Sequence, residues 1–161
     1  MGLFPPAPGG GESVNHGYKG KGVVIHLIAE GSGKPLAIIT TPANGDERLQ
    51  VKNLLEKVLV RLVKTMPILE ADKGYDCLWL RAQLLEKNIF PLIPYRANNR
   101  NAALYKETFQ IKSVRWRVER AFSWLKRKCR RLLMRWERKI LNWEAFTTLG
   151  LIFMWLEDLL R

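Results

Sequence analysis

The stretch VVIHLIAEGSGKPLAIITT, residues 23–41, decides the fold class of this chain. Its two halves are apolar and rich in β-branched residues, and Gly31-Ser32-Gly33-Lys34 lies between them. Two such runs joined by a short glycine-containing turn predict a β-hairpin. The hairpin is expected to end at the turn residues 42–45, which read PANG.

Strands and helices are expected to alternate after the hairpin. Apolar residues at helical spacing predict helices over 46–62, 76–88 and 142–159, with Asp46, Asp76 and Asn142 as the expected N-caps. The short runs 67–71 and 90–93 predict strands. This order predicts an α/β fold with a mixed sheet. Residues 1–22 are predicted to be a Pro/Gly-rich loop or ragged start, without regular structure over 1–13, and residues 23–161 a single domain.

The charge of the chain indicates a polyanionic partner. Its 161 residues carry a formal net charge of +12, and the excess concentrates in the last third. Nucleic acid is the commonest partner of such a surface. Cys77 and Cys129 lie far apart, which indicates free thiols in a reducing cytosol rather than a disulfide framework. The longest apolar run, residues 149–156, is too short to span a bilayer.

The segment KSVRWRVERAFSWLKRKCRRLLMRWERK, residues 112–139, is predicted to be a basic helix containing two acids, Glu119 and Glu137. At about 100° per residue, one face is apolar and comprises Val114, Val118, Ala121, Phe122, Leu125, Cys129 and Leu132. A neighbouring strip holds Lys112, Arg115, Glu119 and Lys126, and the cations facing away from the core are Arg117, Arg120, Arg127, Lys128 and Arg131. A carboxylate at the edge of a buried face, flanked by cations, is the arrangement expected of a metal ligand beside a phosphate track.

Asp72 is the second candidate ligand, because it follows the predicted strand 67–71. Ligands of open α/β sheets bind beyond the carboxyl ends of strands, and convergent carboxylates hold Mg²⁺ or Mn²⁺. Such ions support phosphodiester chemistry. Simpler interpretations stay open: Asp72 as a turn or cap residue, Glu119 as an i,i+4 partner of Arg115, and the basic helix as a solvated face or a simple nucleic-acid binder.

Other chemistry-bearing residues have weaker patterns. Trp116, Trp124 and Trp136 could stack on bases, although packing in a core or an interface is the more common role. His16 and His26 are isolated, and structural roles are expected for both.

Three segments carry a family resemblance. LEADKGYD (69–76) with LRAQLLEKNIFPLIPYR (80–96) resembles the second-Asp segment of bacterial insertion-sequence transposases of the DDE type, in the group of insertion sequences four and five. Residues 17–47 are similar to the hairpin that precedes it. Arg115, Glu119 and Lys126 reproduce the spacing of the family signature, which is Arg, three residues, Glu, six residues, Lys.

The resemblance implies a ribonuclease H-like fold, Mg²⁺ or Mn²⁺, and DNA cleavage with strand transfer. Asp72 would be the second catalytic Asp and Glu119 the third acid, both of them metal ligands. Arg115 and Lys126 would contact transposon-end DNA or orient the Glu, and the expected DNA-binding set is Lys112, Arg115, Arg120, Lys126 and Arg127. The implied partners are transposon ends, an upstream-frame transposase polypeptide and a second copy in a homodimer, with no membrane, in the bacterial cytoplasm at the nucleoid.

Two departures from the family pattern shape the expected activity. Lys112 stands where the signature has Tyr, and no Asp precedes Asp46, so the first catalytic Asp would fall at about Met1 or before it. We therefore expect the C-terminal part of a transposase, missing an N-terminal strand and inactive by itself, either a decayed copy or one frame of a split protein. The alternatives are a non-catalytic DNA-binding fragment that competes for transposon ends, and a pseudogene product that does not fold stably.

Overall fold

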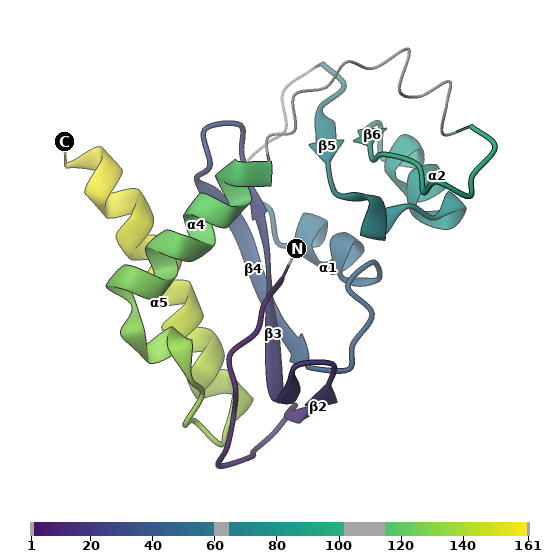
Figure 1. Cartoon of the computed structure of the whole chain (residues 1–161). Coiled ribbons are helices and arrows are strands. Elements are labelled where there is room, and N and C mark those ends of the chain that lie inside the picture. The colour runs from purple at the N-terminus through teal and green to yellow at the C-terminus, as the bar shows by residue number, and fades with distance from the viewer. Residues whose placement is uncertain (1, 60–64, 102–114, 161) are drawn as a thin grey trace. The chain divides into compact units, whose positions relative to one another are not determined.

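A computed structural model of the chain describes residues 2–59, 65–101 and 115–160, and of Arg115 it describes the backbone (Figure 1). The chain divides into two compact units, one formed by Met1–Leu59 with Arg117–Arg161 and the other by Val60–Trp116. The single domain expected over residues 23–161 stays a prediction.

The first unit is built on the predicted hairpin. Strand β3 (Gly20–Ala29) pairs antiparallel with β4 (Pro35–Pro42), and the register places Leu27 opposite Ile38. On its other edge β3 pairs with β1 (Gly2–Leu3) and β2 (Asn15–Gly17), both antiparallel. The predicted hairpin is confirmed. Strand β3 is the central strand of the sheet because it is apolar on both faces.

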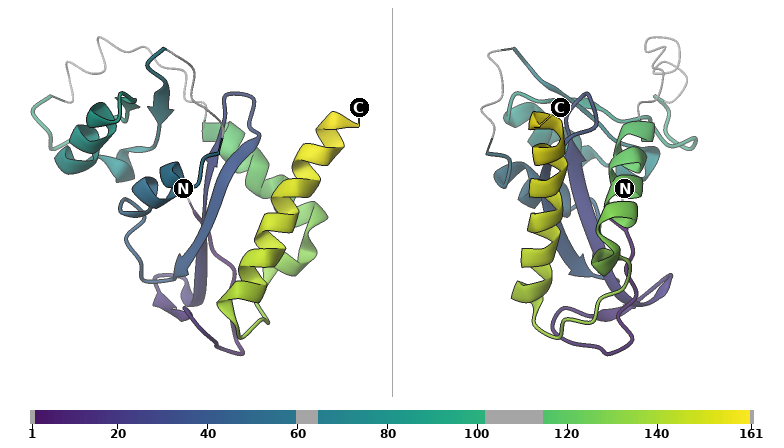
Figure 2. Two further views of the ribbon diagram at one scale, coloured as in Figure 1. Left: turned by 180° about the vertical axis from the view of Figure 1, so that it is seen from behind. Right: turned by 90° about the vertical axis from the view of Figure 1, so that its left-hand side faces the viewer.

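Helices cover both faces of this sheet (Figure 1). Helix α1 (Gln50–Glu56) packs Leu54 against Ala37 and Ile39 on one face. Helices α4 (Arg115–Lys128) and α5 (Ile140–Leu159) lie side by side over the other face (Figure 2). The three layers and the alternation of strands with helices confirm an α/β fold.

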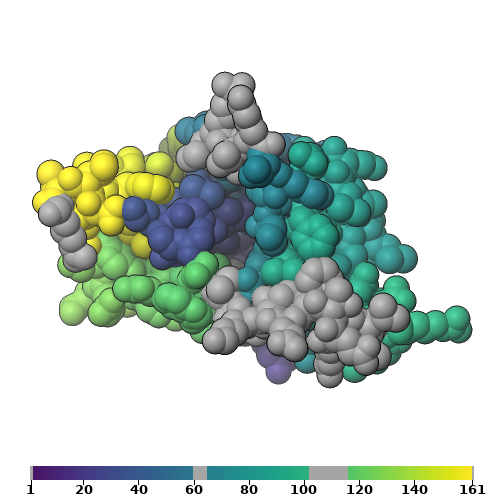
Figure 3. Space-filling view, turned by 90° about the horizontal axis from the view of Figure 1, so that it is seen from above, coloured from purple at the N-terminus to yellow at the C-terminus, as the bar shows by residue number. Residues whose placement is uncertain are grey.

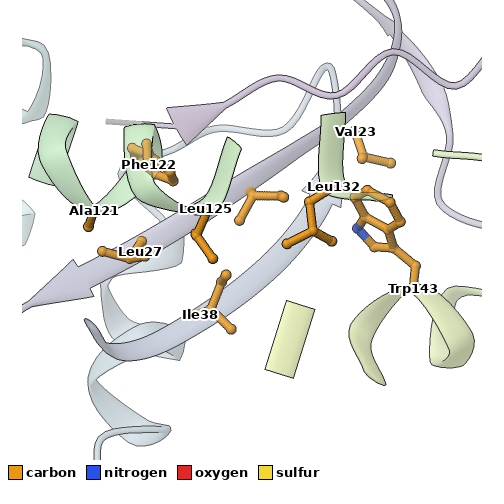
Figure 4. Packing of buried hydrophobic residues seen from close by; sticks show 9 residues of the cluster. Val23, Leu27, Ile38, Ala121, Phe122, Leu125, Leu132 and Trp143 are labelled. Atoms are coloured by element: carbon orange, nitrogen blue, oxygen red, sulfur yellow. The ribbon is translucent and has the colours of Figure 1, made fainter. Parts of the chain in front are cut away.

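The core lies between the sheet and the α4–α5 layer (Figure 4). Ala121, Phe122 and Leu125 of α4 are buried there, as the periodicity predicted. They join Val23, Ile25, Leu27, Ile38, Leu132 and Trp143. Val114, the first residue of the predicted apolar face, lies outside the described residues.

The prediction that residues 1–13 lack regular structure is wrong. Besides β1, Pro6 forms a bridge with Gly22. The backbone N–H of Glu12 donates to the carbonyl of Arg138 at 2.8 Å, and the Glu12 carboxylate accepts from the Ile140 N–H at 2.9 Å. A Cβ on Gly11 would lie 2.6 Å from the Arg138 oxygen, so glycine permits this close approach. Contacts with residues more than 120 positions downstream therefore order this segment, and local composition cannot predict such contacts.

The predicted helix over 112–139 is also shorter than expected. Helix α4 ends at Lys128, and a 3₁₀ turn, η2 (Arg130–Leu133), and an irregular segment follow it. Arg135 in that segment is fully buried, and its Nε donates to the Glu137 carbonyl at 2.9 Å. Burial lowers the pKa of the Arg135 guanidinium. A continued helix would use the backbone carbonyls that this buried cation requires.

The three predicted N-caps are wrong as well. Asp46 accepts from the backbone and guanidinium of Arg48, which lowers the Asp46 pKa, while α1 begins after Leu49. Asn142 lies inside α5, whose N-cap is Lys139. The first predicted helix is also shorter than expected, since α1 ends at Glu56 and Val58 and Leu59 lie outside any helix. The remainder of the prediction, residues 60–62, lies outside the described residues.

The second unit contains a two-stranded parallel sheet among its described residues. Strand β5 (Ile68–Glu70) pairs with β6 (Phe90–Leu92), and helix α2 (Leu78–Glu86) connects them. Both predicted strands are confirmed. Leu80 and Leu84 of α2 are buried. Among the described residues of both units, no helix is long and apolar enough to cross a membrane.

His26 is buried on the α1 side of the hairpin, with Nε2 2.7 Å from Thr41 Oγ1. Burial lowers the pKa of His26 from 6.5 to about 4. The unfolded chain therefore takes up a proton at this site near pH 6.5, whereas the folded chain does so only near pH 4.

Stability should consequently be complete above pH 6.5 and fall as the pH drops toward 4, by about 3 kcal/mol at most. Urea unfolding at successive pH values measures this loss. His26→Leu removes the titrating group, so its unfolding free energy should vary less over that window. An equally steep pH profile in the variant would contradict the assignment to His26.

Candidate active site and nucleic-acid surface

Asp72 lies two residues beyond the carboxyl end of β5, where the sequence predicted it. It is half-buried and caps the 3₁₀ turn η1 (Lys73–Tyr75), and its Oδ1 accepts from the Gly74 N–H at 2.7 Å. A Cβ on Gly74 would lie 2.8 Å from that same Oδ1, so a larger residue here would displace the Asp72 carboxylate. The cap geometry of the simpler interpretation is therefore present, and it fixes the direction of the carboxylate.

Asp76 at the end of this turn is not the expected N-cap. The N-cap of α2 is Cys77, without a side-chain cap bond, and Asp76 forms a buried ion pair with Arg81 at 2.9 Å. The second Asp76 oxygen accepts from the backbone N–H of Arg96 at 2.8 Å. Arg81 also donates to the Ile93 carbonyl at 2.6 Å and stacks over Tyr95. Sequence reasoning missed both arginines, although an Arg within the apolar run LWLRAQLLE was a signal for a buried partner.

Glu119 lies in the other unit, on α4, and its side chain is exposed. Arg120, Lys126 and Arg127 are exposed along the same helix. The two remaining members of the predicted DNA-binding set are not described at the side-chain level, because Lys112 lies outside the described residues and Arg115 is described by its backbone.

Several basic residues near α4 are already matched by carboxylates. Lys128 pairs with Glu157 of α5 at 2.9 Å, and Arg131 pairs with the buried Glu137 at 2.6 Å. Lys34 of the β3–β4 turn pairs with Asp158. This turn reaches the surface between α4 and α5 (Figure 3). The Lys34 and Lys128 pairs connect α5 to the β3–β4 turn and to α4, so these two cations have a structural role.

The aromatic and thiol residues of this region have different roles. Trp124 is half-buried, and its Nε1 donates to Glu157 at 3.1 Å, so it packs on the core. Trp116 and Trp136 are 51% and 58% exposed, so core packing does not account for them. Burial raises the pKa of the Cys129 thiol, which keeps it protonated and makes it a poor metal ligand or nucleophile.

The oxygen ligands predicted from the sequence fit a hard divalent cation. In Asp72, Oδ1 is occupied by the Gly74 N–H, and a carboxylate retains further acceptor positions on Oδ2. Among the described residues, no three His, Cys, Asp or Glu side chains form a group that could hold a metal ion. Asp72 and Glu119 belong to different units, so their convergence on one ion stays a prediction.

Comparison with known proteins identifies the family of this chain. Residues 5–155 match the family described as Transposase DDE domain, and the chain belongs to this family. It is 33% identical over 131 residues to a Burkholderia cepacia protein assigned as a candidate transposase for insertion sequence element IS402. That match covers 78% of this chain and 58% of the relative, so the chain spans less than two thirds of the relative's length. No solved structure matched the chain.

Proposed function

We propose that this chain is the DNA-binding and metal-binding part of an insertion-sequence transposase. The family match over residues 5–155 is the observation that carries the proposal, because it spans both the Asp72 turn and the α4 helix. The full fold of such a protein would be ribonuclease H-like, with a mixed sheet.

In this proposal Asp72 and Glu119 hold Mg²⁺ or Mn²⁺, which supplies charge neutralisation and an activated oxygen at the scissile phosphodiester. The capped turn at Asp72 supports this role, since one carboxylate oxygen is fixed and the other is available. The exposed Arg120, Lys126 and Arg127 hold DNA phosphates beside Glu119. Lys112 and Arg115 complete the DNA-binding set.

Two acids are fewer than the three that the family resemblance implies. Hard divalent cations in nucleases are held by several oxygen ligands, and loss of one weakens both binding and orientation. We therefore propose that the 161-residue chain binds DNA, binds the metal ion only weakly and does not cleave DNA. Cleavage requires a further acid.

A single plasmid experiment tests this function. Supercoiled plasmid incubated with the full chain and Mg²⁺ or Mn²⁺ should be retarded on a gel but stay supercoiled. Nicking that Asp72→Asn or Glu119→Gln abolishes would show that the chain's acids suffice. Failure to retard the plasmid at low salt would overturn the DNA-binding proposal, whereas retardation without nicking also fits a fragment that competes for transposon ends.

A further inference from the structure

One arginine, Arg96, donates hydrogen bonds to the turn that carries Asp72. Arg96 follows β6 as Asp72 follows β5, and parallel strands bring their carboxyl ends to the same edge of a sheet. The Arg96 Nε donates to the Lys73 carbonyl at 3.3 Å, and its Nη2 donates to the Gly74 carbonyl at 3.2 Å. Both carbonyls belong to the peptide segment that Asp72 caps.

The backbone of Arg96 is itself anchored in the unit. Its N–H donates to Asp76 Oδ2 at 2.8 Å, and Asp76 Oδ1 is held by Arg81. The Asp76 and Arg81 side chains are 7% and 10% exposed, so the ion pair that holds Asp76 is shielded from water. Hydrogen bonds to charged groups in such surroundings are strong, which fixes the point from which the Arg96 side chain reaches the turn.

We propose that Arg96 is a positioning residue for the Asp72 carboxylate. Gly74 joins the two interactions, because its N–H holds Asp72 Oδ1 while its carbonyl accepts from Arg96. Arg96 thereby fixes the peptide that orients the carboxylate and reduces the number of conformations that metal binding must select. This inference rests on the proposed role of Asp72 as a metal ligand.

Electrostatics and positioning give opposite signs for the removal of Arg96. Loss of a positive charge near Asp72 would by itself strengthen the binding of a divalent cation. Loss of the two carbonyl contacts would loosen the turn and thereby weaken the binding of the cation. Substitution of a residue that orients a metal ligand typically lowers the affinity for the metal about 10–100-fold. Because the bond from Gly74 to Asp72 remains, we expect about tenfold weaker binding in Arg96→Met.

The test uses the full ¹⁵N-labelled chain and Mn²⁺ alone, with paramagnetic broadening of the Gly74 and Tyr75 amide signals as the readout. Broadening in the wild-type chain should require less Mn²⁺ than in Arg96→Met. Arg96→Lys retains the charge and one donor, so its affinity should be intermediate. Arg100→Met, which removes the same charge from an exposed residue of the following turn, should bind Mn²⁺ at least as well as wild type.

Two outcomes separate this inference from the proposed function. If Asp72→Asn leaves the broadening unchanged, Asp72 is not a ligand, and both the metal site and the positioning role are overturned. If Asp72→Asn abolishes it while Arg96→Met and Arg96→Lys bind Mn²⁺ as tightly as wild type, the positioning role fails and the metal site stands. The Gly74 chemical shift without Mn²⁺ reports whether each variant retains the turn.

Discussion

The affinity of this protein for duplex DNA should fall steeply as salt is raised, with log K linear in log salt and a slope of about −0.9 for each phosphate contact. Arg120, Lys126 and Arg127 would account for three contacts, or about −2.7 of the slope. Over a fourfold rise in salt, from about 50 to about 200 mM, three contacts correspond to a loss of about 40-fold. Contacts made by Lys112 and Arg115 would add to it.

Replacing Arg120, Lys126 and Arg127 together by Gln should therefore reduce the slope by about 2.7 and abolish most binding at physiological salt. Fluorescence anisotropy of a labelled duplex at five salt concentrations gives both quantities. The matched control replaces Lys34, Arg48 and Lys57 by Gln. It lowers the formal net charge equally, from +12 to 12 − 3 = +9, at cations that lie outside α4.

The two triple variants distinguish DNA binding through a specific surface on α4 from attraction by the net charge of the chain. If both reduce the slope equally, attraction to DNA comes from the overall charge of the chain, and α4 has no special role. If the control binds as wild type while the α4 variant does not, the exposed residues of α4 contact the phosphates. Single substitutions would then assign each contact, since each should change the slope by about 0.9.

The features that could be predicted are those with local causes. The hairpin followed from two β-branched runs and a glycine-containing turn, and the core face of α4 followed from the spacing of Ala121, Phe122 and Leu125. Asp72 was found because it follows a strand, and its turn geometry depends on the adjacent Gly74. Each signal lies within a few residues of the feature that it determines.

Most of the features that could not be predicted depend on distant partners. Asp76 has good N-cap chemistry, but it binds Arg81 and also the backbone N–H of Arg96, which lies 20 residues downstream. Asp46 is a local exception, because Arg48 binds its carboxylate. The end of α4 depends on the buried Arg135, whose backbone N–H donates to the Pro6 carbonyl at 2.9 Å. Arg96 is an ordinary exposed arginine in the sequence, and its relation to Asp72 becomes visible once β5 and β6 pair.

Helix α5 shows a further limit of periodicity. The apolar residues that recur at helical spacing in this segment include Phe146, Leu149, Phe153 and Leu156, yet these side chains are 38–58% exposed. The buried residues are Trp143, Thr147 and Gly150. A helix that is apolar around most of its circumference has no distinct apolar face, so hydrophobicity alone cannot determine which face packs inward. Hydrogen bonds select it instead: Trp143 Nε1 donates to Thr40 at 3.1 Å, and Trp155 Nε1 donates to the Pro35 carbonyl at 2.8 Å.

Trp143→Ala should consequently destabilise the protein by about 3–5 kcal/mol, because it leaves a cavity in the core and the Thr40 hydroxyl without its indole donor. Such a loss is a large fraction of the about 5–15 kcal/mol typical of whole domains. Trp143→Phe keeps most of the apolar volume and removes the indole donor, so it should cost less than the alanine variant. The free energy of unfolding in urea measures both effects.

Phe153→Ala is the matched control, since Phe153 is an aromatic residue of the same helix and is 58% exposed. Its cost should be within about 1 kcal/mol, because little area leaves the core. A larger loss from Phe153→Ala than from Trp143→Ala would mean that α5 packs through the face that carries Phe153, and the arrangement of the α4–α5 layer on the sheet would have to be revised.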